Sequence, residues 1–266
     1  MPDAKTAEAE SILVARDGAI ATVTLNRPDR LNALDLKSWN GLAKIFGELS
    51  SDDSLRCVVI RGAGGKAFAA GADIQAFEKE RADARAAKTY AQALQRALSA
   101  VAEGKHPVVA LISGVCVGGG LELASVCDIR ICGESSRFGV PVKKLGITMA
   151  YGELTALVSL VGPAAAREIL LEGEVFGAER ALALGLVNRV VPDGEVEKES
   201  YAAAKRIAEG APLVARWHRK FIRRLADPKP LTQAEIDESY AAMDTEDYRE
   251  GVRAFLAKKS PNFTGR

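Results

Sequence analysis

The sequence predicts an α/β fold with largely parallel sheets, followed by a helical C-terminal region. Short β-branched or apolar segments alternate with helical ones over the first part of the chain, which is typical of repeated strand–helix units. Strand patterns almost vanish after about residue 150, where helical patterns take over. With 266 residues, of which 48 % are hydrophobic, the chain is long enough for one large domain or a domain with an appendage.

The expected strands are short and apolar. Residues 20–25 (IATVTL) alternate small and β-branched side chains, and residues 57–60 (CVVI) have the pattern of a buried strand. Residues 108–113 (VVALIS) and 128–132 (DIRIC) repeat that pattern, and a shorter candidate lies at 186–191 (LVNRVV). Their order along the chain, with helices between them, predicts the parallel pairing.

Three helices are expected between these strands. The first follows Asp35, a suitable N-cap, and places its apolar residues from Leu36 to Leu49 on one face. Residues 81–103 are alanine-rich and strongly helical, and a short helix contains residues 121–124.

Helical patterns dominate the chain from Ala164 onward. The last two lie near residues 212–226 and 232–257. We therefore expect residues 1–195 to form an α/β core and residues 196–266 to form a C-terminal helical region. No low-complexity linker separates the two parts.

Charge and composition exclude several classes of partner. The 36 Lys and Arg residues balance 35 Asp and Glu residues, so no global field attracts the protein to nucleic acid or to an anionic membrane. The N-terminal residues MPDAKTAEAE are polar and acidic, and no segment offers about 18 uninterrupted apolar residues. We expect a cytoplasmic protein without nucleic-acid or membrane partners.

The cysteines and histidines argue against metal chemistry. The chain has two histidines, so a histidine-rich metal site or a Ser-His-Asp triad is not expected. No C-x-x-C pair occurs, and all four cysteines lie in or beside apolar runs, which predicts buried free thiols. These cysteines are Cys57, Cys116, Cys127 and Cys132.

Two glycine-containing loops are the strongest candidates for a reactive site. Neither 62–73 nor 114–120 has the glycine spacing of a Walker or dinucleotide-binding loop. Each can offer a backbone N–H that no side chain shields, and two such donors on one oxygen form an oxyanion hole, worth about 10²–10³ in rate per donor. Glu122, one turn into the helix after the second loop, suits an acid or base, or simply favours the helix dipole.

Five segments together resemble the crotonase, or enoyl-CoA hydratase/isomerase, superfamily, and they occur in the family's order over nearly the whole chain. The resemblance implies a spiral of repeated ββα units and C-terminal helices that pack a homotrimer or a dimer of trimers. It also implies an acyl-CoA thioester as the ligand, with no cofactor beyond the substrate's own coenzyme A. The segments are NRPDRLNAL (26–34), KAFAAGADI (66–74), ISGVCVGGGLELASVCDIR (112–130), RFGVPVKKLGI (137–147) and FLAKKSPNF (255–263).

The family's functional positions fall on named residues of this chain. The resemblance implies that the N–H groups of Ala72 and Gly119 form the oxyanion hole and that Glu122 is the main acid/base. It also implies a set of residues that cradle the acyl-CoA. That set is Arg27, Leu31, Ala70, Asp73, Ile74, Gly118, Pro141, Val142, Phe255 and Lys258 or Lys259.

One position departs from the family pattern. Hydratases that this chain resembles carry a second glutamate in FGxPExxLG, and Val142 stands there in FGVPVKKLG. Glu153 and Tyr151, in MAYGELTAL, are the candidates to replace it, although a helix N-terminus or plain pocket lining also explains them. An enoyl-CoA hydratase is the favoured function. The alternatives are an isomerase, decarboxylase or hydrolase acting on a CoA thioester, or a non-catalytic acyl-CoA-binding protein.

Overall fold

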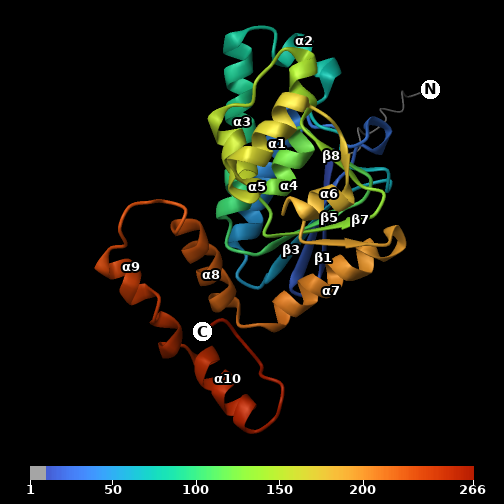
Figure 1. The fold of residues 1–266 in the computed structure, drawn as a ribbon. Helices are drawn as coiled ribbons and strands as arrows, with labels where there is room; N and C mark the ends of the chain where they lie inside the picture. The colour runs from blue at the N-terminus through green and yellow to red at the C-terminus, as the bar shows by residue number, and fades with distance from the viewer. Residues whose placement is uncertain (1–9) are drawn as a thin grey trace, which may run out of the picture.

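The computed structural model describes residues 10–266, and all but the last residue of the polar N-terminal segment MPDAKTAEAE lies outside them. A six-stranded sheet runs through the body in the order β1-β2-β3-β5-β7-β10 (Figure 1). Only β1 and β2 pair antiparallel, so the sheet is largely parallel, as predicted. Its strands are β1 Ile12–Asp17, β2 Ile20–Leu25, β3 Cys57–Gly62, β5 Val108–Ile112, β7 Ile129–Gly133 and β10 Arg189–Val191.

A second, smaller sheet has the order β4-β6-β8-β9. Its strands have two or three residues each: β4 Ala67–Ala69, β6 Val115–Val117, β8 Arg137–Gly139 and β9 Phe176–Gly177. The sequence prediction missed β1 of the large sheet, and it also missed all four of these short strands and treated 62–73 as a loop. Such short segments carry no periodicity of their own, because their partners across the sheet determine their extended conformation.

The two sheets are built by one repeated unit. In each repeat, one strand joins the large sheet, the next joins the small sheet, and a helix follows. The repeats are β3-β4-α3, β5-β6-α4 and β7-β8-α5, with α3 at Ala84–Glu103, α4 at Gly119–Ser125 and α5 at Tyr151–Glu172. This arrangement agrees with the ββα spiral that the resemblance implies.

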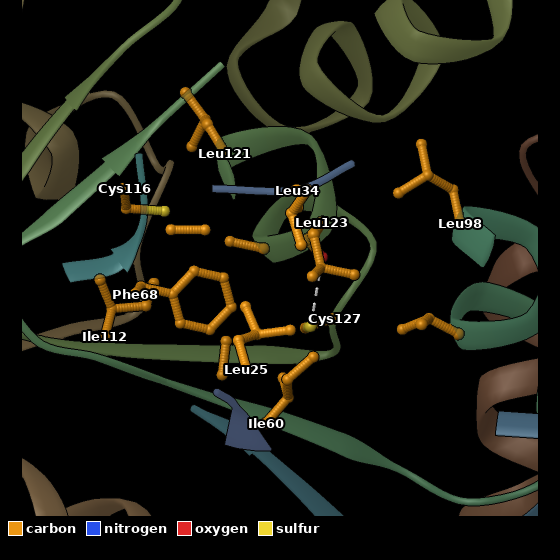
Figure 2. Close-up of a cluster of buried hydrophobic side chains, with 14 of the residues drawn as sticks. Leu25, Leu34, Ile60, Phe68, Leu98, Ile112, Cys116, Leu121, Leu123 and Cys127 are labelled. Atoms are coloured by element: carbon orange, nitrogen blue, oxygen red, sulfur yellow. Dashed lines mark hydrogen bonds between the residues drawn. The ribbon is translucent and has the colours of Figure 1, made fainter. Parts of the chain in front are cut away.

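Both faces of the large sheet are covered by helices. Along β3, Val58 and Ile60 point into the main core, whereas Cys57 and Val59 face a second cluster beneath α7 (Val196–Glu209). The period of two is that of a strand buried on both faces. In the main core Phe68 lies among side chains from both sheets and from α4 (Figure 2). All four cysteines are buried free thiols, as predicted.

The structure confirms Asp35 as the N-cap of the first helix. Helix α1 spans Leu36–Ser51, and the Asp35 carboxylate accepts a hydrogen bond from the Ser38 N–H at 2.8 Å. It buries Trp39, Leu42 and Phe46 against α3, and these three side chains are at most 3 % exposed.

The last helices lead away from the body of the molecule (Figure 1). Helix α8 (Pro212–Arg224) contacts the body through Arg219, whose guanidinium bonds the Asp128 carboxylate at 2.8 Å. The single helix expected over 232–257 is two helices, α9 (Gln233–Glu238) and α10 (Glu246–Leu256), because the Thr245 hydroxyl caps a new start. The division at residue 195 stays a prediction. Since α7 packs on the sheet, its contacts favour a boundary after this helix.

Helix α5 is long and apolar enough, by length and composition alone, to cross a membrane. It is broken at Gly162, whose φ of 74° is not helical, and Pro163 follows directly. It buries Leu157, Ala166 and Ile169 in the main core. Short helices α2 (Phe77–Glu80) and α6 (Ala178–Ala183) complete the body.

Gly120 lets α4 approach the small sheet, which gives a first prediction. A Cβ at Gly120 would lie 2.3 Å from the Ala69 carbonyl oxygen, so Gly120→Ala is expected to lower the free energy of unfolding by about 2 kcal/mol or more. The control is Gly47→Ala on the exposed side of α1, where nothing lies within 4 Å and the change favours the helix. Denaturant unfolding measures the free energy of unfolding of both variants. Equal stability of the two variants would contradict the close approach.

Candidate active site

A cavity of about 270 Å³ lies where β4 and β6 of the small sheet end. The loop after β4 and the start of α4 form one side. Helices α2 and α3, the segment 141–149 and the first turn of α5 form the rest. The walls are mainly apolar, with few charged groups among the lining side chains. Those charged groups are Arg81, Glu122, Lys144 and Glu153.

The two glycine loops meet at this cavity, as an oxyanion hole built from both of them requires. A Cβ at Gly71 would lie 3.8 Å from the Gly119 nitrogen, and one at Gly118 would lie 3.6 Å from the Gly71 Cα. Gly71 and Gly118 have φ values of 99° and 49°, a backbone conformation that side chains disfavour. The three consecutive glycines therefore have separate roles: Gly118 turns the chain, while Gly119 and Gly120 allow close packing.

Two backbone N–H groups at this meeting point are free. In the first loop, the Ala70 N–H donates to the Leu31 carbonyl and the Asp73 N–H to the Leu34 carbonyl, each at 2.9 Å. Among the hydrogen bonds of residues 10–266, none uses the N–H of Ala72, which lies between them. Gly119 is the first residue of α4, where an N–H has no partner within the helix. The geometry leaves two donors available to one ligand oxygen.

A buried series of hydrogen bonds holds the backbone on which the Ala72 and Gly119 N–H groups lie. The Trp39 indole lies under Gly119, since a Cβ there would be 3.1 Å from the Trp39 ring. Its Nε1–H donates to the Tyr90 hydroxyl at 2.7 Å, and that hydroxyl donates to the Leu34 carbonyl at 3.2 Å. Burial raises the pKa of Tyr90 to about 12, so the hydroxyl keeps its proton. The same Leu34 carbonyl holds the loop that presents Ala72.

Glu122 lies on the first turn of α4 with its carboxyl in the cavity wall. It is 8 % exposed, and its Oε2 has no hydrogen-bond partner. Burial raises the pKa of Glu122 to about 8, and the nearby charge of Glu153 adds to the rise, while Arg81 opposes it. A buried carboxyl without a partner is costly for stability alone, and a proton near neutral pH suits acid–base chemistry.

Glu153 joins Glu122 in the same cavity. It is the third residue of α5, and its Oε2 accepts a hydrogen bond from the Ala150 N–H at 2.7 Å. Burial raises the pKa of Glu153, while the Ala150 N–H and Arg81 oppose that rise. The structure thus places this candidate both at a helix N-terminus and in the cavity. Tyr151 is 92 % exposed, so the other candidate for the missing glutamate faces solvent.

Nothing in the sequence pattern singles out Arg81. It follows α2 in the charged run 78–85 (EKERADAR), which resembles an ordinary solvated surface. In the structure its guanidinium carbon lies 3.9 Å from the centre of the Tyr90 ring and 4.7 Å from that of Phe77. Such contacts are cation–π interactions, and they hold the charge at the cavity wall.

The residues expected to cradle the acyl-CoA divide into two groups. Five of them line the cavity: Ala70, Ile74, Gly118, Pro141 and Val142. The other five, Arg27, Leu31, Asp73, Phe255 and Lys258, lie outside its lining.

Two residues of the second group, Arg27 and Asp73, stabilise the loop after β4, which lies beside the cavity. The Arg27 guanidinium bonds the Asp73 carboxylate at 2.7 Å and that of Asp35 at 3.1 Å. These contacts connect the loop after β2 to the loop that presents Ala72. Phe255 lies near the end of α10 and is 83 % exposed, and Lys258 follows that helix.

Comparison with known proteins identifies the family. The family described as enoyl-CoA hydratase/isomerase matches residues 15–266. A probable enoyl-CoA hydratase of Mycobacterium bovis is 36 % identical, over 97 % of this chain and 99 % of its own length. A short-chain-enoyl-CoA hydratase of Clostridium acetobutylicum is 32 % identical, over 95 % and 97 %.

A solved structure extends the agreement to the fold. The enoyl-CoA hydratase/carnithine racemase of Magnetospirillum magneticum superposes with a TM-score of 0.95 at 54 % identity, covering 97 % of each chain. The fold, its repeated ββα units and the sequence therefore agree, and this chain belongs to the enoyl-CoA hydratase/isomerase, or crotonase, superfamily of acyl-CoA enzymes.

Proposed function

We propose that this protein is an enoyl-CoA hydratase, which adds water to a 2-enoyl-CoA to give a 3-hydroxyacyl-CoA. The observation that supports this function best is the pair of carboxyl groups, Glu122 and Glu153, in one cavity beside two free N–H groups. The relatives described as enoyl-CoA hydratases, one of them short-chain, support the same reaction and favour a small acyl group.

The proposed role of Ala72 and Gly119 is to stabilise negative charge. When water attacks the β-carbon, electron density moves to the thioester oxygen, which becomes an enolate. The N–H groups of Ala72 and Gly119 would donate to that oxygen, and the developing charge strengthens both hydrogen bonds. Trp39 and Tyr90 would hold the two donors in place.

The two carboxyl groups would divide the proton transfers. Hydration needs a base that takes a proton from water and an acid that gives one to the α-carbon. Glu122 has a pKa raised to about 8, so it holds its proton at neutral pH and suits the acid. Glu153, whose carboxylate oxygen accepts a hydrogen bond from the Ala150 N–H, suits the role of the base. On this proposal the site needs no carboxylate at Val142.

We also propose that the reaction uses no metal and no redox cofactor. Hydration changes no overall oxidation state, so no electron acceptor is required, and the enolate charge has its own donors. Coenzyme A would enter as part of the substrate, with Ala70 and Ile74 at the cavity wall and Lys144 exposed beside it. A cytoplasmic location remains our expectation.

We further propose a homotrimer or a dimer of trimers. The C-terminal helices leave many large apolar side chains exposed, and burial of such a surface favours association. Light scattering at micromolar concentration is expected to give three or six times the chain mass, and a monomer mass would contradict the proposal. The exposed side chains include Ile222, Leu225, Tyr240, Met243, Phe255 and Leu256.

The function is tested with crotonyl-CoA and the purified protein. Loss of the absorbance of the enoyl thioester, together with 3-hydroxybutyryl-CoA in the product, is the expected result. Turnover no greater than that of Glu122→Ala would contradict hydration. Binding of CoA esters without any product would instead favour a non-catalytic acyl-CoA-binding protein.

A further inference from the structure

We propose that Arg81 forms a subsite for a carboxylate at the far end of the acyl group, so that the preferred substrate is the monothioester of an unsaturated dicarboxylic acid. This inference rests on the proposed hydratase function and adds the class of acyl group. Its basis is the position of the guanidinium, its contacts and the charges that surround it.

The guanidinium is fixed by aromatic rings and retains unused donors. Tyr90, which is 1 % exposed, and Phe77 both contact it at cation–π distance. The N–H donors of a guanidinium lie at the edge of its plane. The Nε atom is buried and has no hydrogen-bond partner. A planar carboxylate is the ligand that such an edge binds best.

No protein carboxylate pairs with this cation. Among the ion pairs of residues 10–266, in which nitrogen and oxygen lie within 4.0 Å, none includes Arg81. Other arginines near the site are paired: Arg27 bonds two aspartates. Arg81 influences Glu122 and Glu153 from a longer distance, since it lowers the pKa of both.

The charge balance of the cavity favours an incoming anion. Its lining contains two basic groups, Arg81 and Lys144, and two carboxyl groups. Because Glu122 is mostly protonated at pH 7, even a fully ionised Glu153 leaves more positive than negative charge. A substrate carboxylate would restore the balance, whereas a cationic acyl group would increase the excess.

The positions of Arg81 and of the proposed reacting groups determine where along the acyl chain the carboxylate would lie. The thioester oxygen would lie at Ala72 and Gly119, and the double bond would lie near Glu122. Arg81, Phe77 and Leu94 line the same cavity as Glu122, and Arg81 is near enough to lower the pKa of Glu122, so an acyl chain that continues past Glu122 would extend toward Arg81. A volume of about 270 Å³ suits a short chain, such as a five-carbon diacid.

The test compares three enoyl-CoA substrates of similar size that differ in the charge of the acyl end. Glutaconyl-CoA is anionic, 5-methylhex-2-enoyl-CoA is neutral, and 4-trimethylammoniobut-2-enoyl-CoA is cationic. For the wild-type protein, kcat/KM is expected to fall in that order. In Arg81→Met, the ratio of kcat/KM for the anionic substrate to kcat/KM for the neutral one is expected to fall by roughly 10- to 100-fold, whatever the effect on the carboxyl pair that both substrates share. Arg81→Lys should retain part of the preference for the anion.

The control and the contrary outcomes are distinct. Arg85→Met removes a nearby arginine on the exposed side of α3 and should leave all three rates unchanged. An equal loss for all substrates in Arg81→Met would overturn the proposal, because Arg81 would then act only on the carboxyl pair. No preference of the wild type for the anion would overturn it as well.

A binding measurement tests the Arg81 subsite independently of the proposed catalytic function. If the wild type hydrates none of the substrates, the proposed function fails. Calorimetric titration with the three CoA esters still measures the subsite: tighter binding of the anionic ester, lost in Arg81→Met, supports it, and equal binding overturns it.

Discussion

Replacing Glu122 by glutamine is expected to lower kcat for crotonyl-CoA by about 10³-fold, since general acid–base groups contribute roughly 10²–10⁴. Glutamine keeps the shape of the side chain but can neither give nor take the proton. Binding of a CoA ester, measured by calorimetry, should change little, because the two N–H donors and the cavity walls remain. A variant that keeps most of its activity would show that Glu122 is not the main acid/base.

The same substitution has an opposite effect on stability at alkaline pH. The pKa of Glu122 is about 8 in the folded protein against an ordinary value of 4.5. The folded state therefore binds the proton more tightly, and its stability falls as the pH rises from about 4.5 through 8. At pH 9 Glu122→Gln should be more stable than the wild type by on the order of 5 kcal/mol, whereas at about pH 4 the two should be similar.

Denaturant unfolding of both proteins at the two pH values isolates this group, since other titrating residues are common to them. An activity loss without a gain in stability at alkaline pH would mean that the carboxyl is not buried as the structure has it.

The second large effect is expected for Glu153→Gln, with kcat/KM for crotonyl-CoA reduced by about 10²-fold or more. Without Glu153 the site lacks its base, and Val142 cannot replace it. The negative charge of Glu153 also contributes to the raised pKa of Glu122, so its removal should move the alkaline limb of the pH–rate profile to lower pH.

The matched control for this variant is Glu172→Gln, at the other end of the same helix, where the side chain is exposed. Its rate and pH profile should equal those of the wild type. If Glu153→Gln also behaves like the wild type, Glu153 only caps α5.

Five of the six strands of the large sheet could be predicted because each has a local pattern, whereas the edge strand β1 was missed because only one of its residues is buried. Residues 20–25 and all but the last of residues 108–113 are β-branched or apolar, and they match β2 and β5 closely. The small sheet could not be predicted, because strands such as β4 exist only through their neighbours. Without them the repeat of one strand in each sheet is not visible in the sequence.

In the candidate site, too, residues close together in the sequence could be predicted as a group, whereas those that only the fold brings together could not. Gly118 and Glu122 stand four residues apart, so the sequence could connect them directly. Glu153 lies far along the chain from both, and only the packing of α5 against α4 brings it to the same cavity. The charged run around Arg81 gives no indication of a site, and only the fold places its guanidinium on the rings of Tyr90 and Phe77.

Arg27 and Asp73 form an ion pair that the sequence did not predict, while their expected contact with the acyl-CoA stays a prediction. Both were expected to contact the acyl-CoA, and their types suit a polar ligand. In the structure they bond each other at 2.7 Å and connect two loops. A pair of opposite charges far apart in the sequence gives no indication, before the fold is known, that each is the other's partner.

The most direct test of the central claim is a crystal structure of Glu122→Gln with crotonyl-CoA bound, since the substrate would persist in the inactive site. We expect the thioester oxygen within hydrogen-bond distance of the Ala72 and Gly119 nitrogens. The glutamine that replaces Glu122, together with Glu153, should face the α- and β-carbons. A thioester oxygen bound elsewhere, or an acyl group that Glu153 cannot reach, would contradict the proposed mechanism.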